Sequence, residues 1–204
     1  MLELMRKYDK RFHQVTTEDV YGSSPLVFTD HFYEKSCYDL RNPYFSTKAA
    51  ANLLIRAYVK TYIIKATISS CSTNFWPNQH PEKLIPKTIL IALLGKKIPI
   101  YGSGKQVRDR IYVKDHCIAR NLIIHNGRIG ETYVVSSEND INNLNVIINI
   151  LKILGVTHNL IVNVRYRPGH NKRYSLSRMN IRKEIGWSPR YSFNDALRAT
   201  VKHY

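Results

Sequence analysis

Cysteine is scarce in this sequence, and the few that occur are not paired. The 204 residues include three cysteines, Cys37, Cys71 and Cys117, and none has the CxxC spacing of zinc or redox motifs. This pattern argues against a secreted disulfide scaffold and favours a reducing compartment, so we expect a cytoplasmic protein. With 9 glycines and 8 prolines, a collagen-like chain is excluded.

Long hydrophobic runs are also missing. The longest candidate, Ile89 to Leu94, is far shorter than the ~20 apolar residues that cross a bilayer. The N-terminus becomes charged at Glu3 and Arg6 before a signal-peptide core develops. We therefore expect no membrane association. The histidines show no metal-ligand spacing either, so we expect no metal site.

Acidic residues are few, with 15 against 31 lysines and arginines, which gives a formal net charge of +16. A surplus of this size attracts polyanions. The basic residues are nevertheless scattered in pairs such as Lys96-Lys97, and the chain has no zinc-finger, RNA-recognition or zipper pattern. We favour a solvated basic surface over a nucleic-acid interface. A small anionic ligand such as a nucleotide diphosphate is equally compatible with the charge.

The residues that are present can build a core, because 44% are hydrophobic. Their periodicity predicts alternating strands and helices, with Asn143 as a cap and Gly155 as a stop for one helix. We expect strands at 11–16, 65–70, 98–101, 131–135 and 160–166, and helices at 44–58, 84–94, 115–125, 144–154, 177–185 and 193–203. Strand, helix and strand in succession indicate a parallel pair and an α/β fold.

Tyr44 and Lys48 lie four residues apart where a helix is predicted to begin. They would share one helix face. A lysine ammonium beside a phenol lowers the phenol's pKa and makes it a usable general base. An exposed pair without function is the simpler interpretation of this spacing alone.

Thr17, Glu18 and Asp19 follow the first predicted strand directly. Ligands of open α/β sheets bind at the carboxyl ends of strands, so this position suits acid and base chemistry. Repulsion between adjacent carboxylates can raise one pKa, so that one group stays protonated as the acid. On spacing alone, a solvated acidic turn is as good an interpretation.

Several segments together resemble the dTDP-glucose 4,6-dehydratases, which are extended short-chain dehydrogenase/reductases. The segments are Thr17-Glu18-Asp19-Val20-Tyr21-Gly22, Tyr44-Phe45-Ser46-Thr47-Lys48, Pro81-Glu82-Lys83-Leu84-Ile85-Pro86, Pro99-Ile100-Tyr101-Gly102, Arg108-Asp109 and Arg167-Pro168-Gly169-His170. The resemblance covers essentially the whole chain but only the later part of the family's sequence. It implies an N-terminally truncated member of that family.

The resemblance implies a reaction and a cofactor. In this family NAD oxidises carbon 4 of the hexose of dTDP-glucose, water is eliminated across carbons 5 and 6, and the hydride returns to carbon 6. The product is the 4-keto-6-deoxy sugar nucleotide. The resemblance also implies a homodimer formed through the helix that carries Tyr44 and Lys48.

The same resemblance assigns roles by position. Tyr44 matches the base that takes the hydroxyl proton, and Lys48 matches the residue that binds the nicotinamide ribose. Thr17 matches a substrate contact, and Glu18 and Asp19 match the catalytic acid pair. Asn74 matches a cofactor-site asparagine. The implied substrate contacts are Thr17, Thr73, Lys83, Pro99, Tyr101, Arg108, Arg167 and His170.

The chain departs from the family pattern at several positions. The family's acid pair runs Asp then Glu, whereas Glu18 precedes Asp19 here. Thr73 and Val134 stand where the family has asparagines, and Trp76 replaces a glycine. These departures leave open a catalytically inactive remnant. A sugar-nucleotide epimerase or decarboxylase is a further alternative, which the acid pair disfavours.

The chain has no GxGxxG motif. The nearest match begins at Gly102-Ser103-Gly104, but Val107 stands at the position of the third glycine. We therefore expect an incomplete doubly wound, Rossmann-like parallel sheet and a small α/β substrate-binding portion. Residues 1–80 would form the later half of the NAD-binding domain, and 81–204 mainly the substrate portion with some segments returning to the first. The 11–16 strand would expose an unpaired edge, and the isolated chain would bind NAD poorly and turn over little substrate.

Overall fold

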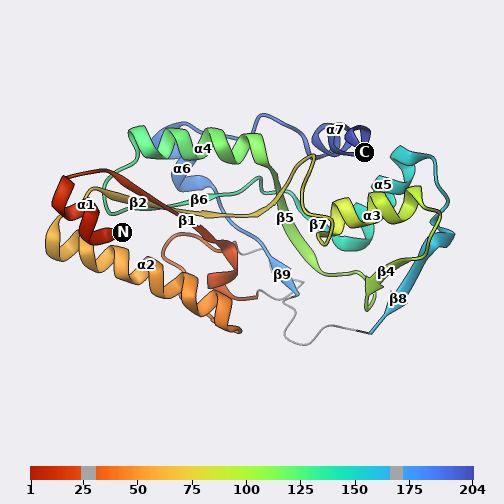
Figure 1. Ribbon diagram of the computed structural model, residues 1–204, viewed down its shortest axis with the longest axis horizontal. Coiled ribbons are helices and arrows are strands. Elements are labelled where there is room, and N and C mark those ends of the chain that lie inside the picture. The colour runs from red at the N-terminus through yellow and green to blue at the C-terminus, as the bar shows by residue number, and fades with distance from the viewer. Residues whose placement is uncertain (24–30, 166–171) are drawn as a thin grey trace.

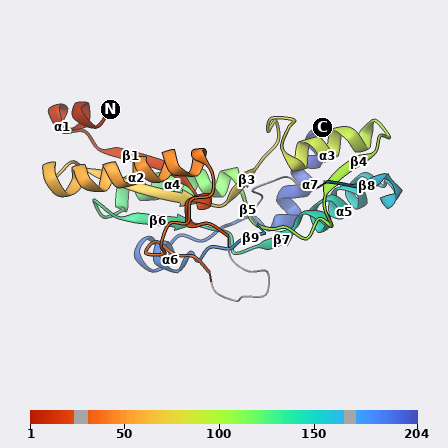
Figure 2. The ribbon, with the colours of Figure 1, turned by 90° about the horizontal axis from the view of Figure 1, so that it is seen from below.

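The computed structural model describes residues 1–23, 31–165 and 172–204. Its elements form two groups side by side along the long axis, one around a three-stranded sheet and one around a four-stranded and a two-stranded sheet (Figures 1 and 2). Parallel strands joined by helices confirm the predicted α/β class.

The first group contains a parallel sheet in the order β1-β2-β6, with α2 on one face and α4 on the other. Its elements are α1 (Leu2–Tyr8), β1 (Phe12–Thr17), η1 (Glu18–Tyr21), α2 (Pro43–Tyr62), β2 (Ala66–Cys71), α4 (Val113–Asn126), β6 (Thr132–Val135) and α6 (Met179–Ile185). Ile55 of α2 packs on Ala66 and Ile68, while Ile123 of α4 packs on Tyr133. Both sheet faces are covered, as is usual for parallel sheets.

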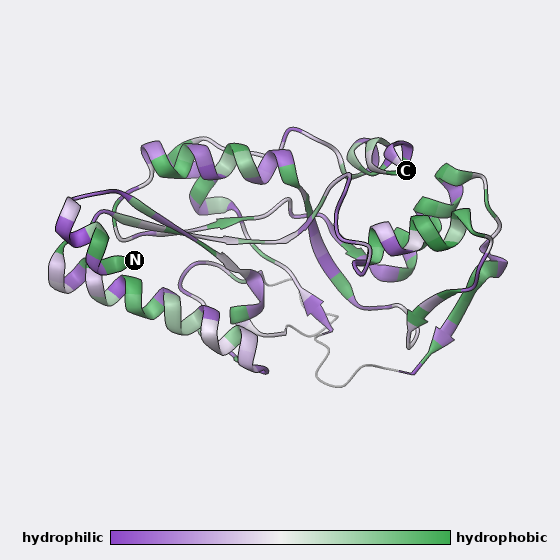
Figure 3. Cartoon of the chain, viewed as in Figure 1, coloured by the Kyte–Doolittle hydropathy of each residue, from purple (hydrophilic) through white to green (hydrophobic). Residues whose placement is uncertain are grey.

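The second group combines two small sheets with three helices. Its elements are β3 (Thr73–Phe75), α3 (Leu84–Leu93), β4 (Ile98–Tyr101), β5 (Val107–Tyr112), β7 (Asp140–Asn142), α5 (Asn143–Leu154), η2 (His158–Leu160), β8 (Ile161–Val164), β9 (Arg173–Tyr174) and α7 (Phe193–His203). Strand β5 pairs with β3, β7 and β9, and β4 pairs with β8. Helices α3 and α5 are largely hydrophobic (Figure 3) and share a core with Phe193 of α7.

Some local predictions need correction. Asn142, not Asn143, caps α5, because its Oδ1 accepts a hydrogen bond from the Asn145 N–H at 2.7 Å. Gly155 ends that helix as predicted, with φ of 68°. The sequence patterns missed α1 and the strands β3, β5, β7 and β9. The end of the predicted 160–166 strand lies outside the described residues.

Helix α2 begins at a well-defined cap, which fixes where its first turn lies. The Asn42 Oδ1 accepts a hydrogen bond from the Phe45 N–H at 3.0 Å, and Pro43 occupies the first helical position. The cap places Tyr44 in the first turn and Lys48 in the second. Within the described residues, β1 pairs with β2 alone, so its other edge is unpaired as expected.

Candidate active site

The carboxyl ends of β1 and β2 form the floor of the candidate site. Thr17 and Cys71 are register partners there, and η1 starts immediately after Thr17. The Thr17 hydroxyl donates to Asp19 Oδ2 at 2.8 Å and accepts from the Asp19 N–H at 3.3 Å. Thr17 therefore caps η1 and holds Asp19 against the end of the sheet.

Glu18 is a buried acid, and few hydrogen bonds offset the cost of burying its carboxyl group. Its side chain is 3% exposed, and its Oε1 accepts a hydrogen bond from the Thr73 hydroxyl at 2.8 Å. Its Oε2 has no hydrogen-bond partner among the described residues. Burial raises the pKa of Glu18 well above its usual value, and the carboxylates of Asp109 and Asp19 raise it further. The expected repulsion from Asp19 is thus present but ranks behind burial.

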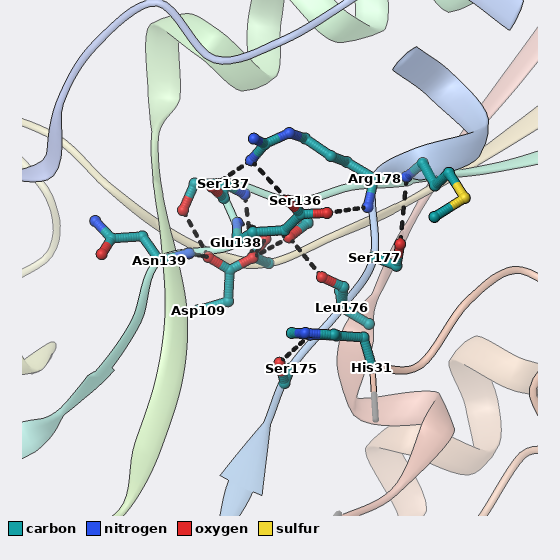
Figure 4. Close-up of polar contacts among 12 residues, drawn as sticks. His31, Asp109, Ser136, Ser137, Glu138, Asn139, Ser175, Leu176, Ser177 and Arg178 are labelled. Carbon is teal, nitrogen blue, oxygen red and sulfur yellow. Dashed lines mark hydrogen bonds and ion pairs between the residues drawn. The ribbon is translucent and has the colours of Figure 1, made fainter. Parts of the chain in front are cut away.

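Asp109 anchors the structure behind Glu18, and the sequence analysis gave it no role in the site. It is fully buried, and five donors from Ser72, Ser136, Ser137 and Asn139 lie within 3.1 Å of its carboxylate oxygens. Figure 4 shows the 136–139 segment wrapped around it. Asp109 belongs to the Arg108-Asp109 motif, but only its neighbours in space reveal this function.

Two arginines flank Asp109 on β5. Arg108 is 8% exposed, and its guanidinium lies 4.3 Å from the centre of the Tyr174 ring. Arg110, missed from sequence, donates to Asn143 Oδ1 at 2.6 Å, and its burial and the charge of Arg108 lower its pKa to about 10. The run of three charged residues, 108–110, could have predicted a polar network here, because charged side chains in a buried strand are rarely without partners.

Tyr44 behaves differently from the prediction. Its side chain is 54% exposed, and the Lys48 Nζ lies 5.9 Å from the ring centre while donating to the Val15 carbonyl at 3.5 Å. The pKa of Tyr44 is raised, first by partial burial and then by the negative charges of Asp19 and Cys71, whereas Lys83 opposes this. The predicted lowering of the phenol pKa by Lys48 is therefore wrong for this structure.

The same electrostatic couplings show which groups lie together. The charges of Asp19, Cys71 and Lys83 act on the pKa of Tyr44. Those of Glu18 and Lys48 act on the pKa of Cys71. The phenol and the acid pair therefore surround the carboxyl ends of β1 and β2, although they come from different elements. Helix α2 also packs directly on η1.

The other predicted site residues are distributed over the second group. Asn74 bonds the Ser72 carbonyl through Nδ2 at 3.0 Å and His116 through Oδ1 at 2.9 Å. Lys83 pairs with Glu82 at 2.8 Å on the surface. Pro99 and Tyr101 lie on β4, away from the β1–β2 corner. Arg167 and His170 lie outside the described residues.

Val134 is a core residue in this structure. It is fully buried in a cluster with Val20, Tyr21, Ala49 and Leu176, so it does not replace a polar contact at the surface of the site. In the described parts of the chain, no three His, Cys, Asp or Glu side chains are grouped to hold a metal ion. No helix among the described residues is both long and apolar enough to cross a membrane.

Comparison with known proteins identifies the family. The family model described as GDP-mannose 4,6 dehydratase matches residues 1–200. The chain belongs to this family. It is 42% identical over 205 residues to the dTDP-glucose 4,6-dehydratase of Mycolicibacterium smegmatis, covering 100% of this chain and 62% of that protein. The dTDP-glucose 4,6-dehydratase of Neisseria gonorrhoeae is also 42% identical, with 95% and 59% covered.

Solved structures of the family agree with the fold. A dTDP-glucose 4,6-dehydratase from Bacillus anthracis, crystallised with NAD, superimposes with a TM-score of 0.95 at 40% identity and covers 100% of this chain. This chain spans 64% of that structure and 62% of the M. smegmatis relative. A UDP-glucose 4-epimerase from Thermotoga maritima shares the fold with a TM-score of 0.92 at 22% identity. The expected family and the partial Rossmann-type fold are confirmed.

Proposed function

We propose that this chain carries the acid–base and sugar-binding part of an NAD-dependent dTDP-glucose 4,6-dehydratase. The observation that supports this most is the buried Glu18 beside Asp19 at the end of β1, where η1 packs on α2 and burial raises the pKa of Glu18. Relatives that are about 40% identical to this chain are named for this reaction. A cytoplasmic location, the lack of nucleic-acid binding and the division at residue 80 stay predictions.

The cofactor end of the site fits the nicotinamide riboside better than the rest of NAD. The Lys48 ammonium is held at the carboxyl end of β1 beside the half-exposed Tyr44 ring, where a ribose hydroxyl could accept a hydrogen bond from it. Asn74 stands behind these groups and orders the turn after β2. When bound, NAD would supply a hydride acceptor for carbon 4. The chain itself offers no GxGxxG segment for the pyrophosphate.

The proposed acid–base roles follow the resemblance to the family. Tyr44 would take the proton of the carbon 4 hydroxyl as that carbon is oxidised, which requires the phenol to ionise against its raised pKa. Asp19, at the solvent side of η1, removes the carbon 5 proton. Glu18 donates its retained proton to the leaving carbon 6 hydroxyl, so that water departs. Thr17 orients Asp19, and Thr73 orients Glu18 by hydrogen bonding to it.

The nucleotide would bind across the second group of elements. Lys83 and Arg108 supply cations suited to a diphosphate, and Thr73, Pro99 and Tyr101 line the proposed path of the substrate. Arg167 and His170 complete the proposed set. Two copies of the chain would associate through α2, where Leu53 and Leu54 are 55% and 54% exposed. Replacing both leucines with lysine would then convert a dimer to a monomer in sedimentation experiments.

A chimaera tests the proposed reaction. The N-terminal part of the M. smegmatis relative that this chain lacks would be joined ahead of residue 1, and dTDP-glucose would be assayed by mass spectrometry for the loss of one water. We expect turnover in the chimaera, little in the chain alone, and a loss of about 100-fold or more for Glu18→Gln. A chimaera that binds NAD yet forms no product would favour the inactive remnant.

A further inference from the structure

A cavity lies away from the candidate active site, at the outer edge of β6. It has a volume of about 1000 Å³ and is walled by the 31–35 segment, Arg56 of α2, the 128–132 segment and α6. Helix α6 and β6 lie on the same side of the molecule (Figure 2). Arg56 follows Tyr44 by twelve residues on α2, which is about 18 Å along the helix axis. The cavity is therefore distinct from the Tyr44 site.

The acidic residues of this cavity are already engaged by its walls. The Glu34 Oε1 accepts a hydrogen bond from the Val134 N–H at 2.9 Å. Glu184 accepts from Arg128 and, at 3.0 Å, from the Tyr133 hydroxyl. Because Glu34 occupies the edge of β6, an added peptide strand has no free N–H at Val134 to pair with. The cavity is built for a small molecule rather than for a strand.

The lining carries four cations against the three acids Glu34, Glu131 and Glu184, with Glu131 lying 4.0 Å from Arg128, and in the described part of the chain three of the cations are not paired with an acid. Among the described residues, Lys35, Arg56 and Lys183 form no ion pair. The half-buried Arg56 guanidinium donates to the neutral Thr132 hydroxyl at 2.9 Å and lies 5.9 Å from the Tyr38 ring centre. A guanidinium has five N–H donors, so it can bind an anion in addition. The three come from separate segments around one cavity.

The cavity also offers surface for an organic group. Tyr33 and Met179 line it and are 51% and 74% exposed. An aromatic ring and a thioether both pack on flat apolar groups. A volume of about 1000 Å³ is at the upper end for small-ligand sites, and it exceeds what an inorganic ion needs.

We propose that this cavity binds a small organic phosphate monoester, with the phosphate held by Lys35, Arg56 and Lys183. A doubly charged phosphate matches three cations from three segments better than a single carboxylate does. The organic part packs against Tyr33 and Met179. This site does not depend on the proposed dehydratase reaction.

Titration calorimetry with the full chain tests the site. The probes are phenyl phosphate, glycerol 3-phosphate and phenol, and the variant is Lys35→Gln/Lys183→Gln. Both lysines are exposed, so their replacement leaves the fold intact, which a circular dichroism spectrum checks. The matched control is Lys83→Gln, which removes a cation at the proposed substrate site instead.

The site predicts saturable binding of both phosphates and none of phenol. The double variant should bind phenyl phosphate at least about tenfold more weakly, and Lys83→Gln should change binding less than about twofold. Amide signals of Gly130 and Thr132 should shift on titration. Binding that is lost in Lys83→Gln and kept in the double variant would overturn the proposal, as would the absence of saturation or equal binding of phenol. Tighter binding of phenyl phosphate than of glycerol 3-phosphate would support the role of Tyr33 and Met179, and equal binding would remove that role.

Discussion

Glu18 and Tyr44 lie at the same end of the sheet, yet the side chain of one is 3% exposed and that of the other is 54% exposed. Glu18 is held by Thr73 and backed by Asp109, whose carboxylate has five donors around it. Tyr44 and Lys48 follow the cap of α2, where the Tyr44 ring contacts Phe45 and the Lys48 ammonium donates to the Val15 carbonyl. The acid pair is therefore held in a fixed arrangement, whereas the proposed NAD-facing side at Tyr44 and Lys48 is held by few contacts.

Replacing Asp109 should have the largest effect on stability, because it would remove the hydrogen bonds that order the structure behind Glu18. The Asp109→Asn amide cannot accept from all five donors, so buried hydroxyls and amides lose their partner. We expect the free energy of unfolding, measured by urea titration, to fall by about 3 kcal/mol or more. The control Asp39→Asn removes an exposed ion pair with Arg41 and should cost less than about 1 kcal/mol. Equal losses in both variants would mean that Asp109 is not an anchor.

Two histidines of the first group, the half-buried His13 and the buried His116, should give the next largest effect. Burial, with the charge of Arg120, lowers the pKa of His13 and of His116 to about 4 from 6.5. Unfolded histidines bind protons first as pH falls, so stability should decrease from about pH 6.5 to 4. Each should contribute roughly 2 kcal/mol over this range.

The double variant His13→Gln/His116→Gln isolates this effect. Its free energy of unfolding, followed by urea titration across the same pH range, should fall less steeply than that of the parent. The exposed His80→Gln serves as the control and should leave the slope unchanged. A double variant that keeps the parent's slope would show that these histidines titrate normally.

Glu18 should produce a pH dependence of the opposite sign. Its pKa is raised in the folded state, so the folded chain holds a proton that the unfolded chain releases above about pH 4.5. Stability from this group is therefore lost as pH rises. Glu18→Gln mimics the protonated form, so its stability relative to the parent should be higher at pH 8 than at pH 4. A variant less stable at pH 8 than at pH 4, relative to the parent, would contradict this.

Tyr44→Phe should have the smallest effect on folding. The ring is half exposed and its contact with Phe45 is kept, so urea unfolding should change by less than about 0.5 kcal/mol. In the active chimaera the same change should lower turnover about 100-fold or more. A large loss of stability would show that the surroundings of Tyr44 are packed as tightly as those of Glu18.

Sequence periodicity was enough to predict the long helices, because α2, α4, α5 and α7 each present several apolar residues at helical spacing. The strands β3, β7 and β9 have three residues or fewer, too few to show an alternation. Strand β5 was missed for another reason, since its three charged residues are buried by partners distant in the chain. Local pattern does not carry that information.

The candidate site divides in the same way. The positions of Thr17, Glu18 and Asp19 at a strand end follow from the sequence, as does the helix start at Tyr44. The sequence could not show that Asp109 lies behind Glu18, because the residues between them form half of the molecule. It also misjudged the pKa of Tyr44, because the Lys48 ammonium is directed to the Val15 carbonyl rather than to the phenol.

The most direct test is a carbon-detected NMR titration of the Glu18 side-chain carboxyl, assigned by comparison with Glu18→Gln. Burial beside Asp109 predicts that the pKa of this carboxyl lies well above 4.5, the usual value of a solvated glutamate, so that it ionises after the exposed glutamates as pH rises. A Glu18 carboxyl that ionises together with the exposed glutamates would contradict the account of a preorganised acid.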